Sequence, residues 1–136
     1  MSYVARDPEA FSLDLPRKGG QVKNAKHLAF IRRLPSVISG VYGVQACHLR
    51  MADPRYGKPT AGMGRKPDDC WTLPMTPEEH RAQHNMSERA FWISHGMDDP
   101  CGFAQQLFNV TGDQEAAERL IFDHVATLNQ EFDHGL

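Results

Sequence analysis

The chain has 136 residues, a formal net charge of −2 and 24% charged residues, which is the size and composition of one soluble globular domain. No run of residues approaches the length of an apolar membrane span, and the first residues lack the apolar core of a signal peptide. The three cysteines, Cys47, Cys70 and Cys101, contain no C-x2-C pair, which argues against a disulfide framework and a four-cysteine zinc site. We therefore expect a cytoplasmic protein with no membrane partner.

The beginning of the chain is predicted to be an arm followed by a helix. Residues 1–22 mix polar, Pro and Gly residues and show no sustained periodicity, so we expect a flexible arm, whose Arg17 and Lys18 could contact phosphates, ahead of a single domain at 23–136. Residues 24–34 have the apolar spacing of a short helix, with Asn24 as its N-cap and Pro35 as its stop.

The next part of the chain is predicted to hold short strands and a long loop. Two β segments are expected at 37–39 and 44–48 around a glycine-containing turn, which places His48 at the end of a strand. Residues 50–67 are rich in Gly, Pro and basic residues and are predicted to be a loop. A further short strand is expected at 70–75.

The strongest helix signal lies at 76–84. Thr76 suits the N-cap and Pro77 suits the first helical position. His80 and His84 are four residues apart, so their imidazoles share one face of the helix and can converge on one divalent ion. The alternative is that both histidines are surface groups on an amphipathic helix.

Three more helices are predicted after this one. The first covers 88–93 behind the N-cap Ser87 and ends near Gly96. The others cover 102–109 and 114–132, and the last has a continuous apolar face.

Charge is distributed unevenly along the chain. Residues 1–66 hold 12 Lys and Arg and 4 Asp and Glu, a formal charge of +8, whereas residues 67–136 hold 3 and 13, a formal charge of −10. The asymmetry favours a nucleic-acid ligand, although the two halves could instead neutralise each other across the surface. The candidate phosphate-binding residues of the loop, which could also be merely solvated, are Arg50, Arg55, Lys58, Arg65 and Lys66.

The order of these features suits phosphodiester hydrolysis. That reaction needs a base to take a proton from water and an electrophile to stabilise the charge that develops on phosphorus and on the leaving oxygen. His48 is a candidate base because the imidazole titrates near neutral pH, and an ion held by His80 and His84 is a candidate electrophile.

Several ordered segments resemble the HNH, or ββα-metal, endonuclease superfamily, and in particular phage-borne HNH proteins related to the RecA-dependent nuclease Ref. They are H27-LAFIRRL-P35, A46-CHL-R50, G62-MGRKPD-D69 and H80-RAQ-H84 followed by Phe91-Trp92. The segment M75-TPEEHRAQ-H84 is also similar to the metal-binding helix of colicin-type HNH nucleases.

The resemblance implies an α+β fold in which a ββα-metal core, a short β-hairpin and the metal-binding helix at about 37–90, is flanked by further α-helices. It also implies a phage or prophage DNA endonuclease acting in DNA recombination or processing. Its partners would be DNA and a recombinase filament or another DNA-processing protein.

The resemblance also implies roles for single residues. His48 matches the general base, and His80 and His84 match two ligands of a divalent ion, either zinc or magnesium or manganese. Cys47 stands where relatives carry a third ligand, and a thiolate there suits zinc better than magnesium.

This chain also departs from the family at 34–40, which lacks the Cys pair that relatives often carry for a structural zinc, and at the position of one characteristic Asn. The middle Asn of the family falls on Trp71, so Asp69 is predicted to orient the base or bind the metal, with Asp68 in reserve. These departures leave an alternative open: a non-catalytic DNA-binding or phage-assembly module whose metal site is structural.

Overall fold

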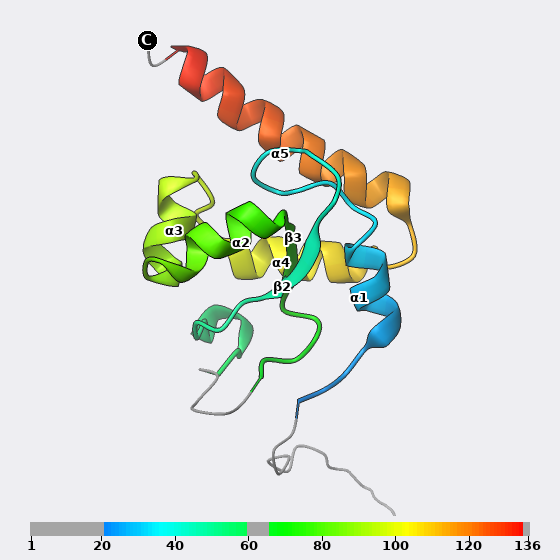
Figure 1. Cartoon of the computed structure of the whole chain (residues 1–136). Coiled ribbons are helices and arrows are strands. Elements are labelled where there is room, and N and C mark those ends of the chain that lie inside the picture. Colours follow the sequence, from blue (N-terminus) through cyan, green and yellow to red (C-terminus); the bar gives the residue numbers. More distant parts are fainter. Residues whose placement is uncertain (1–20, 60–65, 135–136) are drawn as a thin grey trace, which may run out of the picture.

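The computed structural model describes residues 21–59 and 66–134, with side chains described as far as residue 129. This part of the chain has a mixed α+β fold, with five α-helices, one short 3-10 helix and a two-stranded antiparallel sheet (Figure 1). The predicted arm up to residue 20 and the predicted phosphate contact Arg65 lie outside the described residues.

The sheet consists of β2 (Gln45–His48) and β3 (Thr72–Met75). Cys47 lies opposite Leu73 and His48 opposite Thr72. The strands predicted around these positions are therefore confirmed with shorter bounds. Because successive side chains of a strand point to opposite faces, Cys47 and His48 must diverge.

The segment at 37–39, by contrast, is not a strand, and this prediction was wrong. It forms a turn because the buried hydroxyl of Ser36 accepts hydrogen bonds from the amides of Ile38 and Ser39, at 2.9 and 3.1 Å. The Gly40 amide closes the turn on the Ser36 carbonyl, and Gly40 has a φ of 74°. A side chain that captures the amides of its neighbours competes with a strand ladder.

Helices α1 (Ala25–Ile31) and α2 (Pro77–His84) begin where the sequence predicted. Asn24 caps α1 by accepting the amide of His27 at 3.0 Å. In α2, Thr76 and Glu79 form a reciprocal capping box, which fixes the first turn of the helix.

The remaining helices surround this unit. They are η1 (Pro54–Tyr56), α3 (Glu88–Ser94), α4 (Pro100–Asn109) and α5 (Gln114–His134). The long α5 crosses one end of the molecule (Figure 1). In the residues described, no helix is both long enough and apolar enough to cross a membrane.

One hydrophobic core joins the helices to the sheet. Its largest fully buried members include Phe30 of α1, Leu73 of β3 and Phe91 and Trp92 of α3. One face of the sheet therefore packs against the helices in the core, while the ends of β2 and α2 remain at the surface.

Candidate active site

A solvent-open pocket of about 360 Å³ lies between the end of β2 and the exposed side of α2. It brings together three of the predicted site residues, His48, His80 and His84. The full lining is Ala46, His48, Arg50, Lys66, Pro67, His80, Gln83, His84, Met86 and Glu88.

His48 is held by Asp69. Its Nε2 lies 2.8 Å from Asp69 Oδ1. The carboxylate is buried, whereas the imidazole side chain is 25% exposed. The turn that precedes β3 makes this possible, because Trp71 donates to the Asp68 carbonyl and the Thr72 hydroxyl donates to the Asp69 carbonyl. The chain thus folds back so that Asp69 meets the histidine on the neighbouring strand.

The segment just before α1 completes the surroundings of Asp69. Gln21 Nε2 donates to Asp69 Oδ1 at 2.9 Å, and the Asn24 amide donates to Oδ2 at 2.7 Å. The Val22 amide donates to Asp68 Oδ1 at 2.7 Å. Gln21 and Val22, assigned to the arm from the sequence, therefore bind to the folded domain.

These contacts set the charge state of Asp69. Burial acts to raise its pKa, but the hydrogen bonds from the Asn24 amide and from His48 outweigh burial and lower the pKa below its ordinary value. Asp69 is therefore an anion near neutral pH. It can accept Nε2–H of His48, which leaves the lone pair of His48 on Nδ1.

His80 and His84 point toward each other at the end of α2. Their Nε2 atoms are 3.0 Å apart, and the two rings are 4.6 Å apart between centroids. Gln45 of β2 lies behind His80, with its Oε1 2.9 Å from Nδ1 of that histidine. The amide oxygen accepts Nδ1–H, so the lone pair of His80 is on Nε2, facing His84.

The two imidazoles fit a divalent metal ion. Zinc binds imidazole nitrogen at about 2.0–2.1 Å, so two tetrahedral ligands are separated by about 3.3 Å, close to the observed distance. Partial burial, followed by the charge of His84, lowers the pKa of His80, which favours the neutral ring that binds metal. Within the described ranges, however, no group of three His, Cys, Asp or Glu residues could hold a metal ion.

The structure corrects the predicted third ligand, Cys47. Its side chain is only 2% exposed and belongs to the hydrophobic core, on the opposite face of β2 from His48. Burial raises the pKa of the thiol to about 12, so the thiolate needed for metal binding is strongly disfavoured. Trp71, at the position of the family's Asn, is likewise a core residue.

Two of the predicted phosphate contacts, Arg50 and Lys66, line the pocket and are exposed. The backbone at Arg50 is fixed by Glu88, whose carboxylate accepts the amides of Arg50 and Met51 at 2.9 to 3.1 Å. Glu88 was not singled out from the sequence. Its position as the first residue of α3, after the N-cap Ser87, indicated only a favourable interaction with the helix dipole.

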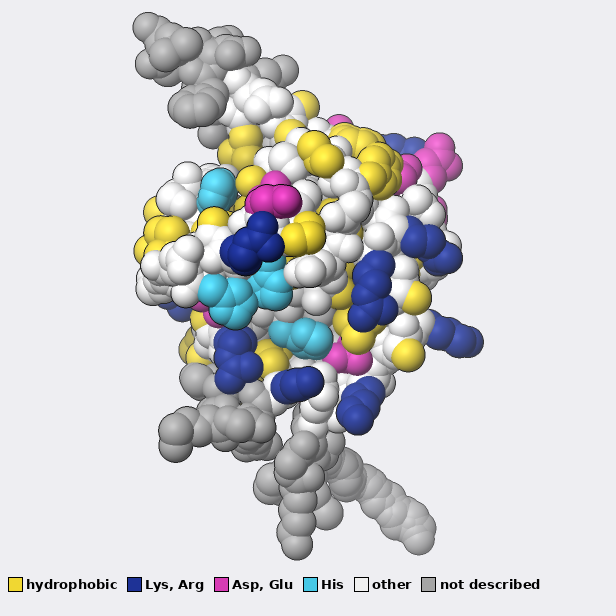
Figure 2. Space-filling view, viewed as in Figure 1, with side chains coloured by type: hydrophobic (Ala, Val, Ile, Leu, Met, Phe, Trp, Pro, Cys, Tyr) yellow, Lys and Arg dark blue, Asp and Glu magenta, His cyan; other side chains and the backbone are white. Residues whose placement is uncertain are grey.

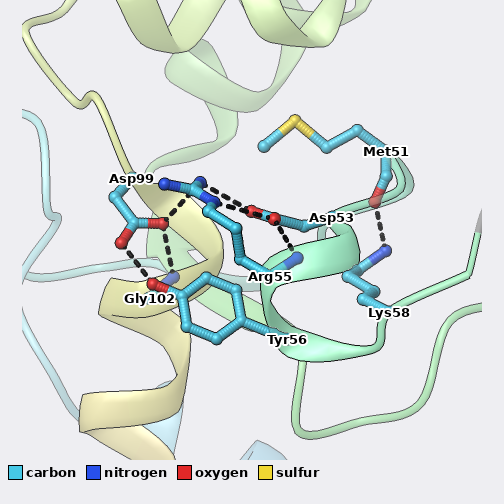
Figure 3. A network of polar contacts seen from close by, with 7 residues as sticks. All are labelled: Met51, Asp53, Arg55, Tyr56, Lys58, Asp99 and Gly102. Carbon is cyan, nitrogen blue, oxygen red and sulfur yellow. Dashed lines mark hydrogen bonds and ion pairs between the residues drawn. The ribbon is translucent and has the colours of Figure 1, made fainter.

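The other two predicted phosphate contacts in the described part of that loop, Arg55 and Lys58, are bound to neighbouring protein groups (Figure 3). Arg55 binds both oxygens of Asp53, at 3.0 and 2.7 Å, and Asp99 at 3.1 Å. Lys58 is 3% exposed and donates to the Met51 carbonyl at 2.6 Å. The prediction that Lys58 contacts DNA is therefore wrong, because its ammonium is buried. Arg55 is already paired with two carboxylates.

Figure 2 shows that Lys and Arg side chains surround the histidines on one face of the molecule.

Comparison with protein-family models, curated proteins and solved structures finds no match to this chain.

Proposed function

We propose that this protein is a metal-dependent DNA endonuclease of the HNH type, which hydrolyses phosphodiester bonds with His48 as the general base. The observation that carries the proposal is the hydrogen bond from His48 to the buried Asp69 in the pocket that also contains His80 and His84. A histidine oriented by a carboxylate is a recurring arrangement for moving a proton.

The order of the elements also supports this proposal. The base lies on β2, β3 pairs with that strand, and α2 follows β3 directly and carries the two facing imidazoles. This is the arrangement that a ββα-metal core requires, and it agrees with the resemblance seen in the sequence.

The residues have distinct tasks in the proposed reaction. Asp69 holds Nε2–H of His48, so Nδ1 can take the proton of the attacking water, and the carboxylate stabilises the imidazolium that results. A divalent ion bound by His80 and His84 would stabilise negative charge on the phosphoryl and leaving oxygens. Arg50 and Lys66 line the same pocket and can bind the flanking phosphates.

The donor set favours one kind of metal. Two imidazoles without a carboxylate suit zinc or a similar transition metal better than magnesium, which prefers oxygen ligands. Because Cys47 is not a ligand, an ion held by His80 and His84 would also bind water and phosphate oxygens.

A plasmid-nicking assay tests the proposal. Wild type, His48→Ala and the control His95→Ala are compared with zinc, manganese or magnesium, on bare DNA and on recombinase-coated DNA. His95 lies at the end of α3 against Phe91 and does not line the pocket. We expect His48→Ala to lower the cleavage rate by at least about 100-fold and His95→Ala to leave it within about 3-fold.

The same assay separates the alternatives. Equal cleavage by wild type and His48→Ala would remove His48 from the mechanism. If no protein cleaves under any condition while DNA binding persists, the chain is instead a non-catalytic DNA-binding or phage-assembly module with a structural metal site.

A further inference from the structure

The basic residues of the described chain fall into two groups. Arg55, Arg81 and Arg119 form ion pairs with carboxylates, and Lys58 is buried against a carbonyl. A second group has no side-chain ion pair or hydrogen bond within the described ranges. The exposed members of this group on and beside α1 are Lys23, Lys26, Arg32 and Arg33.

The surface of α1 carries little besides this charge. Residues 23–33 contain no Asp or Glu. Within the helix the exposed residues are Ala25, Lys26 and Ala29, whereas Phe30 and Ile31 are buried in the core. A protein-binding surface usually offers large apolar or aromatic anchors, and none of the exposed residues of α1 is one. Val22, just before Lys23, is a single exposed aliphatic side chain. Unpaired Lys and Arg side chains that lie among small residues suit a polyanion better than a protein partner.

The hydrogen-bond network places this charge beside the proposed base. Lys23 immediately precedes Asn24, whose amide binds Asp69, and the same carboxylate holds His48. The beginning of α1 is therefore linked to the His48 imidazole through two hydrogen bonds that share the carboxylate of Asp69. Figure 2 shows Lys and Arg side chains over α1 on the face that carries the histidines.

Two parts of the chain bring basic residues toward His48. Arg50 and Lys66 line the pocket with it, while Lys23 and Lys26 are close in the sequence to Asn24, whose amide binds the carboxylate that holds His48. From Lys26 to Ile31 the helix rises by about 7–8 Å, and Arg32 and Arg33 follow directly. One DNA strand advances about 3.4 Å per phosphate along the duplex axis, so this distance matches several phosphates.

We propose that α1 and its flanking residues form a second phosphate-binding strip, which holds the nucleic-acid backbone next to the cleavage site. Lys23, Lys26, Arg32 and Arg33 bind phosphates that lie outside the pocket. This inference rests on the proposed function for the identity of the polyanion, and it extends the binding surface from the pocket to a separate helix.

Binding experiments without metal test the strip independently of cleavage. The probe is a fluorescent duplex of about 24 base pairs, and its affinity is measured by anisotropy in EDTA over a range of salt concentrations. The variants are Lys23→Ala/Lys26→Ala and Arg32→Ala/Arg33→Ala. The control, Arg119→Ala, removes an exposed cation from α5 that is already paired with Glu115. Circular dichroism confirms that each variant is folded.

Each double variant should reduce the slope of log K against log salt by about 1.8, because each lost phosphate contact contributes about 0.9. Arg119→Ala should change the slope by less than about 0.5. Unchanged slopes in both double variants would overturn the strip, as would binding of poly-glutamate as tight as that of the duplex.

Failure of the strip and failure of the proposed function give different results. A wild type that cleaves DNA, with double variants that bind like wild type, retains the function and removes the strip. A wild type that never cleaves, with reduced slopes in the double variants, retains the strip and removes the nuclease function.

Discussion

Two polar clusters of this molecule differ in how their charges are satisfied. In the cluster of η1 and α4, Arg55 is paired with Asp53 and Asp99, and the hydroxyl of Tyr56 donates to Asp99 (Figure 3). In the pocket of β2 and α2, His80 and His84 face each other and the cations Arg50 and Lys66 remain exposed.

The difference separates a structural role from the proposed functional one. The η1 cluster uses its charges to join a loop to α4, since Asp99 is also the N-cap of that helix. The pocket instead keeps lone pairs and positive charge accessible to a ligand. Basic residues of one loop therefore serve different purposes, and the composition of the loop does not distinguish them.

Replacement of the carboxylate behind the base should have the largest effect. Asp69→Asn preserves the shape of the side chain but removes the charge that stabilises the imidazolium of His48. We expect the cleavage rate to fall by about 100- to 1,000-fold with little change in KM. Asp68→Asn, at the neighbouring position, should lower the rate by less than about 10-fold. Equal losses in the two variants would contradict the assigned role of Asp69.

The organisation of the pocket could be predicted from the sequence where local rules set it. The capping box of α2 follows from Thr76 and Glu79, and the spacing of His80 and His84 follows from the helical period. The period of two along β2 also contained a signal against Cys47, because a strand that presents His48 to the pocket turns its neighbour into the core.

The remainder depended on contacts between distant residues. Asp69 is oriented by the amide of Asn24, 45 positions earlier in the chain, and nothing near Asp69 in the sequence indicates that partner. Burial of Lys58 similarly depends on the fold of η1. The Ser36 hydroxyl that forms the turn at 37–39 donates to the carboxylate of Glu79, 43 positions later in the chain. Such long-range pairings are decided by tertiary structure rather than by local propensity.

The orientation of His80 provides the next test. Gln45→Ala removes the acceptor that fixes the Nδ1–H tautomer of His80, so the Nε2 lone pair would be presented less often to the proposed metal ion. Outer partners of metal-binding histidines contribute about 10- to 100-fold in affinity, and we expect a loss in that range for zinc measured by competition with a chelating dye. Gln83→Ala removes an amide from the same pocket and should change affinity by less than about 3-fold.

A disturbance of the η1 cluster should affect stability without affecting the pocket. A Cβ at Gly102 would collide with the Asp99 carboxylate and the Tyr56 hydroxyl. We expect Gly102→Ala to lower the free energy of unfolding by about 1–3 kcal/mol in urea titrations, with unchanged zinc affinity. Adding Tyr56→Phe should recover part of the loss, since it removes one of the colliding atoms.

The acid stability of the protein should depend on Asp69. Burial raises its pKa, but the Asn24 amide and His48 lower it overall, so the folded state favours the anion. That stabilisation is present above the ordinary carboxyl pKa of about 3.9 and is lost as pH falls through the lower folded value. Urea titrations between about pH 5 and pH 2 should show a shallower loss of stability for Asp69→Asn than for wild type.

The two loop arginines provide the smallest and most closely matched test. Arg50→Gln and Arg55→Gln each remove one guanidinium from the same loop, but only Arg55 is paired with carboxylates. Arg50→Gln should reduce the salt slope of duplex binding by about 0.9, whereas Arg55→Gln should change it by less than about 0.3. If the two changes are equal, the nucleic acid also passes over η1. The distinction between paired and available cations would then fail to identify the binding surface.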